Sequence, residues 1–242
     1  MVYKKGGIFM RTYRLEIRLI QAAVGLALVV LIAGFFGLWG RSGNISVGGA
    51  GTGATTSTSN QAQVPSNPKI VALGDSFTWG YPFTQKDSWT QRLQQDLHVT
   101  VINKGKGSQT TKDLLSRFDA DVLAEKPGRV IIFAGIGDGI TNVPLKDVQA
   151  NIQAMVDKAK ANHIIPVLAL PIWYPGANQN IQEIRVWEIS YAQKSSILTL
   201  DFASVLFDSN DKYLSGLSSD NGKYPSIKGY QVMGDYAAGV LK

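Results

Sequence analysis

Apolar runs alternate with amphipathic stretches along residues 69–242, and this alternation predicts the fold. Five short runs are almost wholly apolar, which is typical of strands buried on both faces of a sheet. They cover residues 70–73, 99–102, 130–133, 164–170 and 197–200. The segments between them repeat apolar residues every three or four positions, which predicts helices. We expect helices over residues 88–97, 111–124, 143–161, 181–193 and 227–241.

Strands that alternate with helices, and that are apolar on both faces, predict a parallel sheet covered on each side. We therefore expect residues 69–242 to form a three-layer α/β/α sandwich with a five-stranded parallel sheet. In such folds the functional groups lie beyond the carboxyl ends of the strands. The segments that follow the strands are therefore where candidate chemistry is expected.

The N-terminal part of the chain has a different pattern. Residues 19–40 are an apolar run whose only strongly polar member is Gln21. A helix rises ~1.5 Å per residue, so this run is long enough to cross a ~30 Å hydrocarbon core, and we expect a transmembrane anchor. A cleaved signal peptide is the alternative, but its apolar core usually has ~7–15 residues and a small-residue cleavage site after it.

The flanks of this apolar run predict its orientation. Residues 1–18 are basic, which favours a cytoplasmic N-terminus and an extracellular C-terminal domain on the cell membrane. Residues 41–68 are rich in Gly, Ser and Thr and predict a flexible linker. The codons of Lys5, Gly6 and Gly7 could resemble a bacterial ribosome-binding site, which would make Met10 the true start.

Composition and charge narrow the chemistry. The chain has 24 Lys and Arg against 18 Asp and Glu, a net charge of +6, but residues 69–242 contain 18 basic and 17 acidic residues. The basicity therefore belongs to the N-terminus, and no nucleic-acid partner is expected. With no Cys and only His98 and His163, we expect no metal site and no cofactor.

A Gly74–Asp75–Ser76 turn follows the first predicted strand, which is a typical place for a nucleophilic serine. Four segments in order resemble the conserved blocks of the SGNH (GDSL) hydrolase family. They are residues 70–81, 103–111, 133–138 and 221–230. The resemblance implies the same five-stranded α/β fold, and ester hydrolysis by a Ser–His–Asp triad with an oxyanion hole.

The resemblance implies that Ser76 is the nucleophile and that its backbone N–H belongs to the oxyanion hole. The glycine donor of the second block aligns with Ser108, and Gly107 precedes it. A backbone donor needs no particular side chain, so this role is open to either residue. The asparagine donor of the third block aligns with Gly137, which has no side chain to donate. On this basis we expect Gly137→Asn to add an oxyanion donor.

The last block departs furthest from the family. Tyr224 replaces the histidine and Asn221 replaces the aspartate, while Asp220 is a candidate substitute carboxylate. His98 and His163 each precede a predicted strand, so we expect both at the opposite edge of the sheet from Ser76. The serine therefore lacks a visible activating base.

Aromatic residues follow two of the strands, at positions 79, 81, 173 and 174. Trp79, Tyr81, Trp173 and Tyr174 are candidate ligand-binding residues, since aromatic rings stack on sugars or hold acyl groups. Lysines 104, 106 and 112 surround the second block and are interpreted as solvated.

Two hypotheses follow from these residues. One is a membrane-anchored esterase, lipase or carbohydrate deacetylase with little or no activity. The other is a non-catalytic module that binds a cell-envelope glycan, a lipid or a protein.

Overall fold

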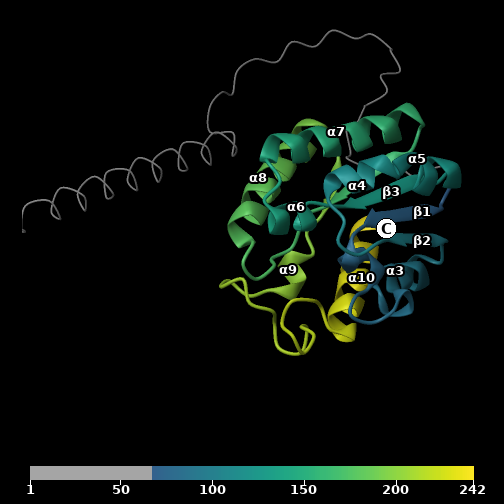
Figure 1. Ribbon diagram of the computed structural model, residues 1–242. Coiled ribbons are helices and arrows are strands. Elements are labelled where there is room, and N and C mark those ends of the chain that lie inside the picture. The colour runs from purple at the N-terminus through teal and green to yellow at the C-terminus, as the bar shows by residue number, and fades with distance from the viewer. Residues whose placement is uncertain (1–66) are drawn as a thin grey trace, which may run out of the picture. The chain divides into compact units, whose positions relative to one another are not determined.

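The computed structural model describes residues 67–242 (Figure 1). The predicted cytoplasmic segment, the anchor and all but the last two residues of the predicted linker lie outside the described residues. A parallel sheet of five strands forms the centre of the domain, in the order β2-β1-β3-β4-β5. The strands are β1 (Ile70–Gly74), β2 (Val101–Gly105), β3 (Arg129–Phe133), β4 (Ile165–Ala169) and β5 (Leu198–Leu200). The predicted sandwich with a five-stranded parallel sheet is confirmed.

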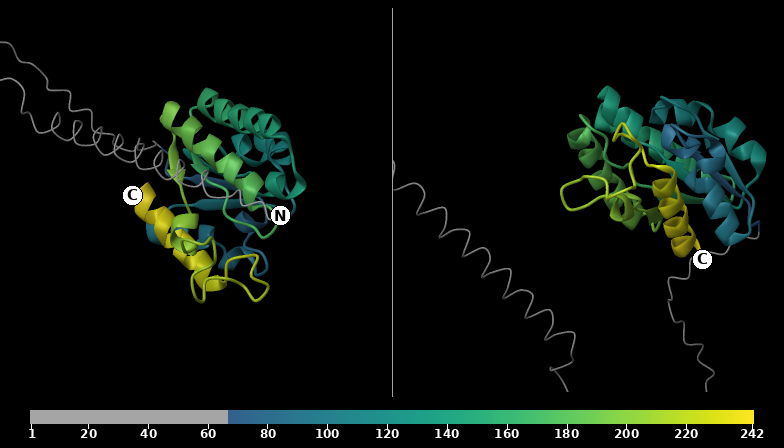
Figure 2. Two further views of the ribbon diagram at one scale, coloured as in Figure 1. Left: turned by 90° about the vertical axis from the view of Figure 1, so that its left-hand side faces the viewer. Right: turned by 90° about the horizontal axis from the view of Figure 1, so that it is seen from below.

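Helices cover both faces of this sheet, as Figures 1 and 2 show. On one face, α3 (Trp89–Leu97) packs closely along α10 (Ile227–Leu241). The other face carries α4 (Thr111–Ser116), α5 (Phe118–Asp121), α7 (Leu145–Ala161) and α8 (Asn178–Lys194). Successive strand residues serve opposite layers: Ile70 and Ala72 belong to one core, and Val71 and Leu73 to the other. This two-sided burial explains why the strands are apolar throughout.

Several elements differ from the sequence-based expectation. The predicted helix over 111–124 is divided into α4, α5 and the 3₁₀ turn η2 (Leu123–Glu125), with the break at Arg117. Apolar spacing continues across the break, since Leu114, Phe118 and Val122 are all buried, and so periodicity alone could not show it. Strand β2 extends to Gly105 through polar residues, because an edge strand is only half-buried.

Short elements were not predicted, because one turn carries too few residues for a periodic signal. They are α2 (Ser76–Trp79), the 3₁₀ turn η1 (Gln85–Asp87), α6 (Ile136–Thr141) and α9 (Ala203–Leu206). Two of these, α2 and α6, begin directly after the strands that carry the first and third family-like blocks. Within residues 67–242, no helix has the length and apolarity needed to cross a membrane.

Candidate active site

The turn after β1 is fixed by close packing and by a helix cap. Gly74 is buried, and a Cβ added to it would lie 2.1 Å from Thr78 Oγ1 and 2.8 Å from the Phe133 carbonyl oxygen. Asp75 caps α2: its Oδ1 accepts a hydrogen bond from the Phe77 N–H at 2.9 Å. Burial raises the pKa of the Asp75 carboxyl to about 7. The fold therefore holds Ser76 in a defined place at the start of α2.

Ser76 lines a cavity of about 390 Å³ together with Trp79, Tyr81, Gly105, Lys106 and Gly107. The second block lies directly beside the serine hydroxyl, since a Cβ added to Gly107 would be 3.8 Å from Ser76 Oγ. In the part of the chain that the structure describes, the N–H groups of Gly107 and Ser108 donate no backbone hydrogen bond. Since Gly107 also lines the cavity, its N–H is a candidate donor to an oxyanion there.

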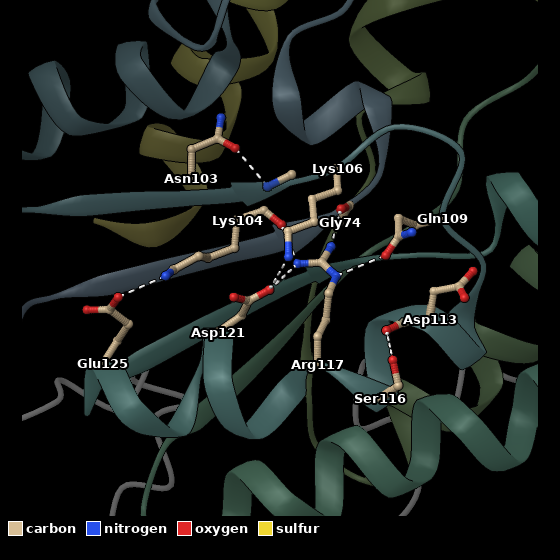
Figure 3. A network of polar contacts seen from close by, with 11 residues as sticks. Gly74, Asn103, Lys104, Lys106, Gln109, Asp113, Ser116, Arg117, Asp121 and Glu125 are labelled. Atoms are coloured by element: carbon tan, nitrogen blue, oxygen red, sulfur yellow. Dashed lines mark hydrogen bonds and ion pairs between the residues drawn. The ribbon is translucent and has the colours of Figure 1, made fainter.

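Arg117 ties this loop to the ends of two strands (Figure 3). Its guanidinium donates to the carbonyl oxygens of Gly74 and Lys104, both at 2.9 Å, at the carboxyl ends of β1 and β2. It also donates to Gln109 Oε1 at 3.0 Å and pairs with Asp121 at 2.5 Å. One side chain thus connects the turn that follows β1, the second block and α5. Sequence reasoning missed this residue, because a half-buried arginine inside an amphipathic pattern gives no distinctive signal.

The third block, residues 133–138, leads into α6, and a buried aspartate in it forms hydrogen bonds with α4. Asp138 accepts hydrogen bonds from the Thr111 N–H at 2.9 Å and the Thr111 hydroxyl at 2.7 Å. Burial raises the pKa of Asp138, although these hydrogen bonds act to lower it. Gly137 has no space for a side chain, since a Cβ there would lie 2.2 Å from the Gln109 carbonyl oxygen. The expectation that Gly137→Asn adds an oxyanion donor is therefore wrong: backbone occupies the space that an asparagine would need.

The last block brings Tyr224 to the nucleophile turn. Its ring centroid lies 4.9 Å from that of Phe77, 4.8 Å from Tyr81 and 6.0 Å from Tyr174. Burial, followed by the neighbouring Tyr174, raises the pKa of Tyr224 to about 12. The hydroxyl therefore stays protonated near neutral pH and is a poor general base.

Asn221, which aligns with the family's aspartate, forms its hydrogen bonds within its own loop. Asn221 is exposed, and its Oδ1 accepts hydrogen bonds from the Lys223 N–H at 2.9 Å and the Ser219 hydroxyl at 3.0 Å. Asp220 is exposed beside it. The described contacts do not join either side chain to Tyr224 or Ser76.

Both histidines lie at the far edge of the sheet. His98 ends α3 just before β2, and the first residue of β2, Val101, pairs with Ile70 at the start of β1. His163 is likewise exposed two residues before β4 begins. Ser76 follows the opposite, carboxyl edge, so neither imidazole is placed to accept its proton.

The four aromatic candidates divide into three environments. Trp79 and Tyr81 line the cavity. Tyr174 joins the aromatic cluster, with its ring 6.4 Å from that of Phe77. Trp173 instead lies under the Arg185 guanidinium, 4.9 Å from ring centroid to Cζ. The structure thus supports a ligand contact for Trp79 and Tyr81 and a packing role for Trp173.

The site therefore contains a serine at the carboxyl edge of β1, where α/β hydrolases place their nucleophile, beside the backbone N–H of Gly107. The family model described as GDSL-like Lipase/Acylhydrolase matches residues 72–232. The chain belongs to this family, which confirms the resemblance seen in the sequence.

Solved and curated relatives extend this assignment. A protein of the G-D-S-L family from Desulfitobacterium hafniense is 58% identical, with a TM-score of 0.72, and the match covers 72% of this chain and 100% of that chain. An arylesterase of Vibrio mimicus is 30% identical over 49% of this chain and 55% of its own length. An uncharacterized lipoprotein of Bacillus subtilis is 30% identical over 41% of this chain and 46% of its own. The chain thus spans about half the length of the curated relatives that it matches.

Proposed function

We propose that this chain is a GDSL-family domain that binds an acyl ester or a cell-envelope glycan beside Ser76 and hydrolyses esters slowly or not at all. Ser76, the cavity and the N–H group of Gly107, which has no backbone acceptor within the described residues, support ligand binding at this site. The family and the arylesterase relative favour an ester as the ligand class.

The observation that carries the loss of activity is the tyrosine at the base position. Tyr224 packs against Phe77 and Tyr81, which follow Ser76 in the chain, and its hydroxyl has a pKa of about 12. In serine hydrolases, loss of the nucleophile or of its histidine lowers turnover on the order of 10⁶-fold. Loss of one oxyanion donor costs ~10²–10³-fold. These effects are not additive, but the first alone would make ordinary ester hydrolysis hard to detect.

An assay of the domain tests this proposal. We expect residues 67–242 to hydrolyse p-nitrophenyl acetate and butyrate little faster than buffer, and Ser76→Ala to leave the rate almost unchanged. A fluorophosphonate probe should label the wild-type domain poorly for the same reason, because the serine is not activated. Rapid turnover that disappears in Ser76→Ala would contradict the proposal, and would mean that another group, such as Tyr224 or Asp220, activates the serine.

We further propose that the domain is held outside the cell membrane by a single helix over residues 19–40. The basic N-terminal flank and the length of the apolar run support this topology. A Bacillus subtilis relative that is named a lipoprotein agrees with a surface location. Protease added to intact protoplasts should release a fragment that begins between residues 41 and 68. Full protection of the chain would contradict this orientation.

A further inference from the structure

The three lysines around the second block have different surroundings in the structure. Lys104 pairs with Glu125 at 2.9 Å, and Lys112 is exposed on α4. Lys106 lines the cavity that contains Ser76. The interpretation of all three as merely solvated is therefore incomplete, since one of them faces the candidate site.

Lys106 shares its ion-pair partner, Asp121, with Arg117. Its Nζ lies 3.4 Å from Asp121, whereas Arg117 holds the same carboxylate oxygen at 2.5 Å. Burial acts to raise the pKa of Asp121, but the hydrogen bonds and charges of Arg117 and, to a smaller extent, Lys106 outweigh it, and the pKa is lowered. Arg117 is thus the closer partner of the Asp121 anion, and Lys106 makes the longer contact with a side chain that is 57% exposed.

The other cavity walls complete a site for an anion with an apolar body. Lys106 is the one formally charged residue among the six that line the cavity. Trp79 and Tyr81 provide an aromatic wall, and Gly107, which also lines the cavity beside Ser76, has an N–H group that donates no backbone hydrogen bond within the described residues. Oxyanions are bound well by an ammonium group together with backbone N–H donors.

We propose that the cavity beside Ser76 selects ligands that carry an oxyanion, either a carboxylate or a phosphate, on an apolar or ring-shaped body. This proposal rests on the proposed function, because it takes the same cavity as the ligand site. Lys106 binds the anionic group, and Trp79 with Tyr81 contacts the body of the ligand. An uncharged analogue of the same shape then loses the interaction with Lys106 but keeps the aromatic contacts.

The isolated domain is suitable for a test. Both hydrophobic cores lie within residues 67–242. The solved Desulfitobacterium hafniense chain is matched over its whole length by 72% of this chain, so a chain of about this size folds without further segments. We suggest titrating the ¹⁵N-labelled domain with phenylacetate, phenylacetamide, phenyl phosphate and phenyl methyl ether, while following the amide signals of Gly107 and Ser108. The acid and the amide have nearly the same shape, so their difference isolates the charge.

We expect phenylacetate or phenyl phosphate to bind at least about tenfold more tightly than its neutral counterpart, with the preference falling as salt rises. Comparing the two acids shows which oxyanion the cavity prefers. Lys106→Gln should abolish the preference for anions, whereas Lys112→Gln, an exposed lysine outside the cavity, should retain it. Trp79→Ala should weaken the binding of charged and neutral ligands to the same extent.

The proposal is overturned if the anions bind no better than the neutral compounds, if none of the four shifts these signals, or if the preference survives in Lys106→Gln. The same titration on Ser76→Ala separates this result from the proposed function. Fast ester hydrolysis by the wild-type domain would contradict the proposed lack of catalysis. The preference of Ser76→Ala for anions over neutral compounds would still test the ligand proposal, because this variant cannot hydrolyse the ester through Ser76.

Discussion

The turn after β1 and the loop before α10 align with the first and the last block of the family, and the structure holds these two segments in different ways. The first is buried: Gly74 fits against Thr78, and Asp75 caps α2 from inside the domain. The second is largely exposed, with Asn221 occupied in its own turn and Tyr224 packed against other aromatic rings. One segment is therefore held by the core, and the other by local contacts near the surface.

This difference shows what a retained Gly-Asp-Ser motif means. Gly74 and Asp75 have structural roles, so the fold requires them whether or not the protein is a catalyst. Ser76 is different: its hydroxyl faces the cavity and forms no side-chain hydrogen bond with any described residue. The serine alone, rather than the whole motif, points to a ligand at this site.

The largest expected effect tests whether the first turn is structural. A Cβ at position 74 would overlap Thr78 Oγ1 and crowd the Phe133 carbonyl oxygen. Overpacking of a rigid core costs ~1–3 kcal/mol, and we expect Gly74→Ala to fall near the upper end, at about 3 kcal/mol of unfolding free energy. Urea unfolding followed by circular dichroism measures it.

Gly239→Ala in α10 is the matched control, because nothing lies within 4 Å of a Cβ added there. That substitution should be neutral or stabilise the helix by ~0.5–1 kcal/mol. If Gly74→Ala were equally harmless, the first turn would not be fixed by packing, and the comparison with the last loop would fail.

The next effect concerns the buried carboxyl of Asp75. Its pKa is about 7 in the folded chain, above the ordinary value, so the folded state binds this proton more tightly than the unfolded state. Its contribution to stability is therefore greatest at low pH and is lost as pH rises from about 4 to about 7. Between pH 5 and 7.5 we expect wild-type to lose roughly 2 kcal/mol through this group.

Asp75→Asn tests this sign, because its amide oxygen can still accept from the Phe77 N–H. Urea unfolding at pH 5 and 7.5 should show a smaller loss of stability in Asp75→Asn than in wild-type. Asp220→Asn, in the exposed loop, should follow the wild-type curve. If the unfolding free energies of wild-type and Asp75→Asn changed in parallel with pH, the pKa of Asp75 would not be raised in the folded state.

How much the sequence predicts depends on the range of the interactions involved. Strand apolarity and helical spacing are local patterns, and they were sufficient for the five-stranded sandwich. The position of the serine follows from one motif and one rule about parallel sheets. Arg117 was missed because three of its four partners, Gly74, Lys104 and Gln109, lie outside the helices that flank it and come together only in the folded chain.

Gly137 shows that a contact between residues far apart in the sequence can also decide the outcome of a substitution. Alignment suggests an asparagine whose side chain was simply removed, and it predicts that restoring the side chain restores a donor. The structure shows the Gln109 carbonyl in that space, and Arg117 holds the Gln109 side chain. A residue far from position 137 in sequence thus decides what position 137 tolerates.

The last prediction, with the smallest expected effect, asks whether the exposed loop can supply the missing base. We expect Asn221→Asp with Tyr224→His to raise p-nitrophenyl acetate hydrolysis about tenfold over wild-type, or ~1.4 kcal/mol, far below full restoration. An aspartate can keep both hydrogen bonds that Asn221 Oδ1 accepts, and a histidine at 224 would lie among Phe77 and Tyr81, beside the serine turn. The gain is modest because catalysis needs alignment to within ~0.5 Å, which a loop held by surface contacts does not provide. Adding Ser76→Ala to the double variant should remove the gain. No gain, or a gain that survives Ser76→Ala, would mean that position 224 does not face the nucleophile as the family alignment implies.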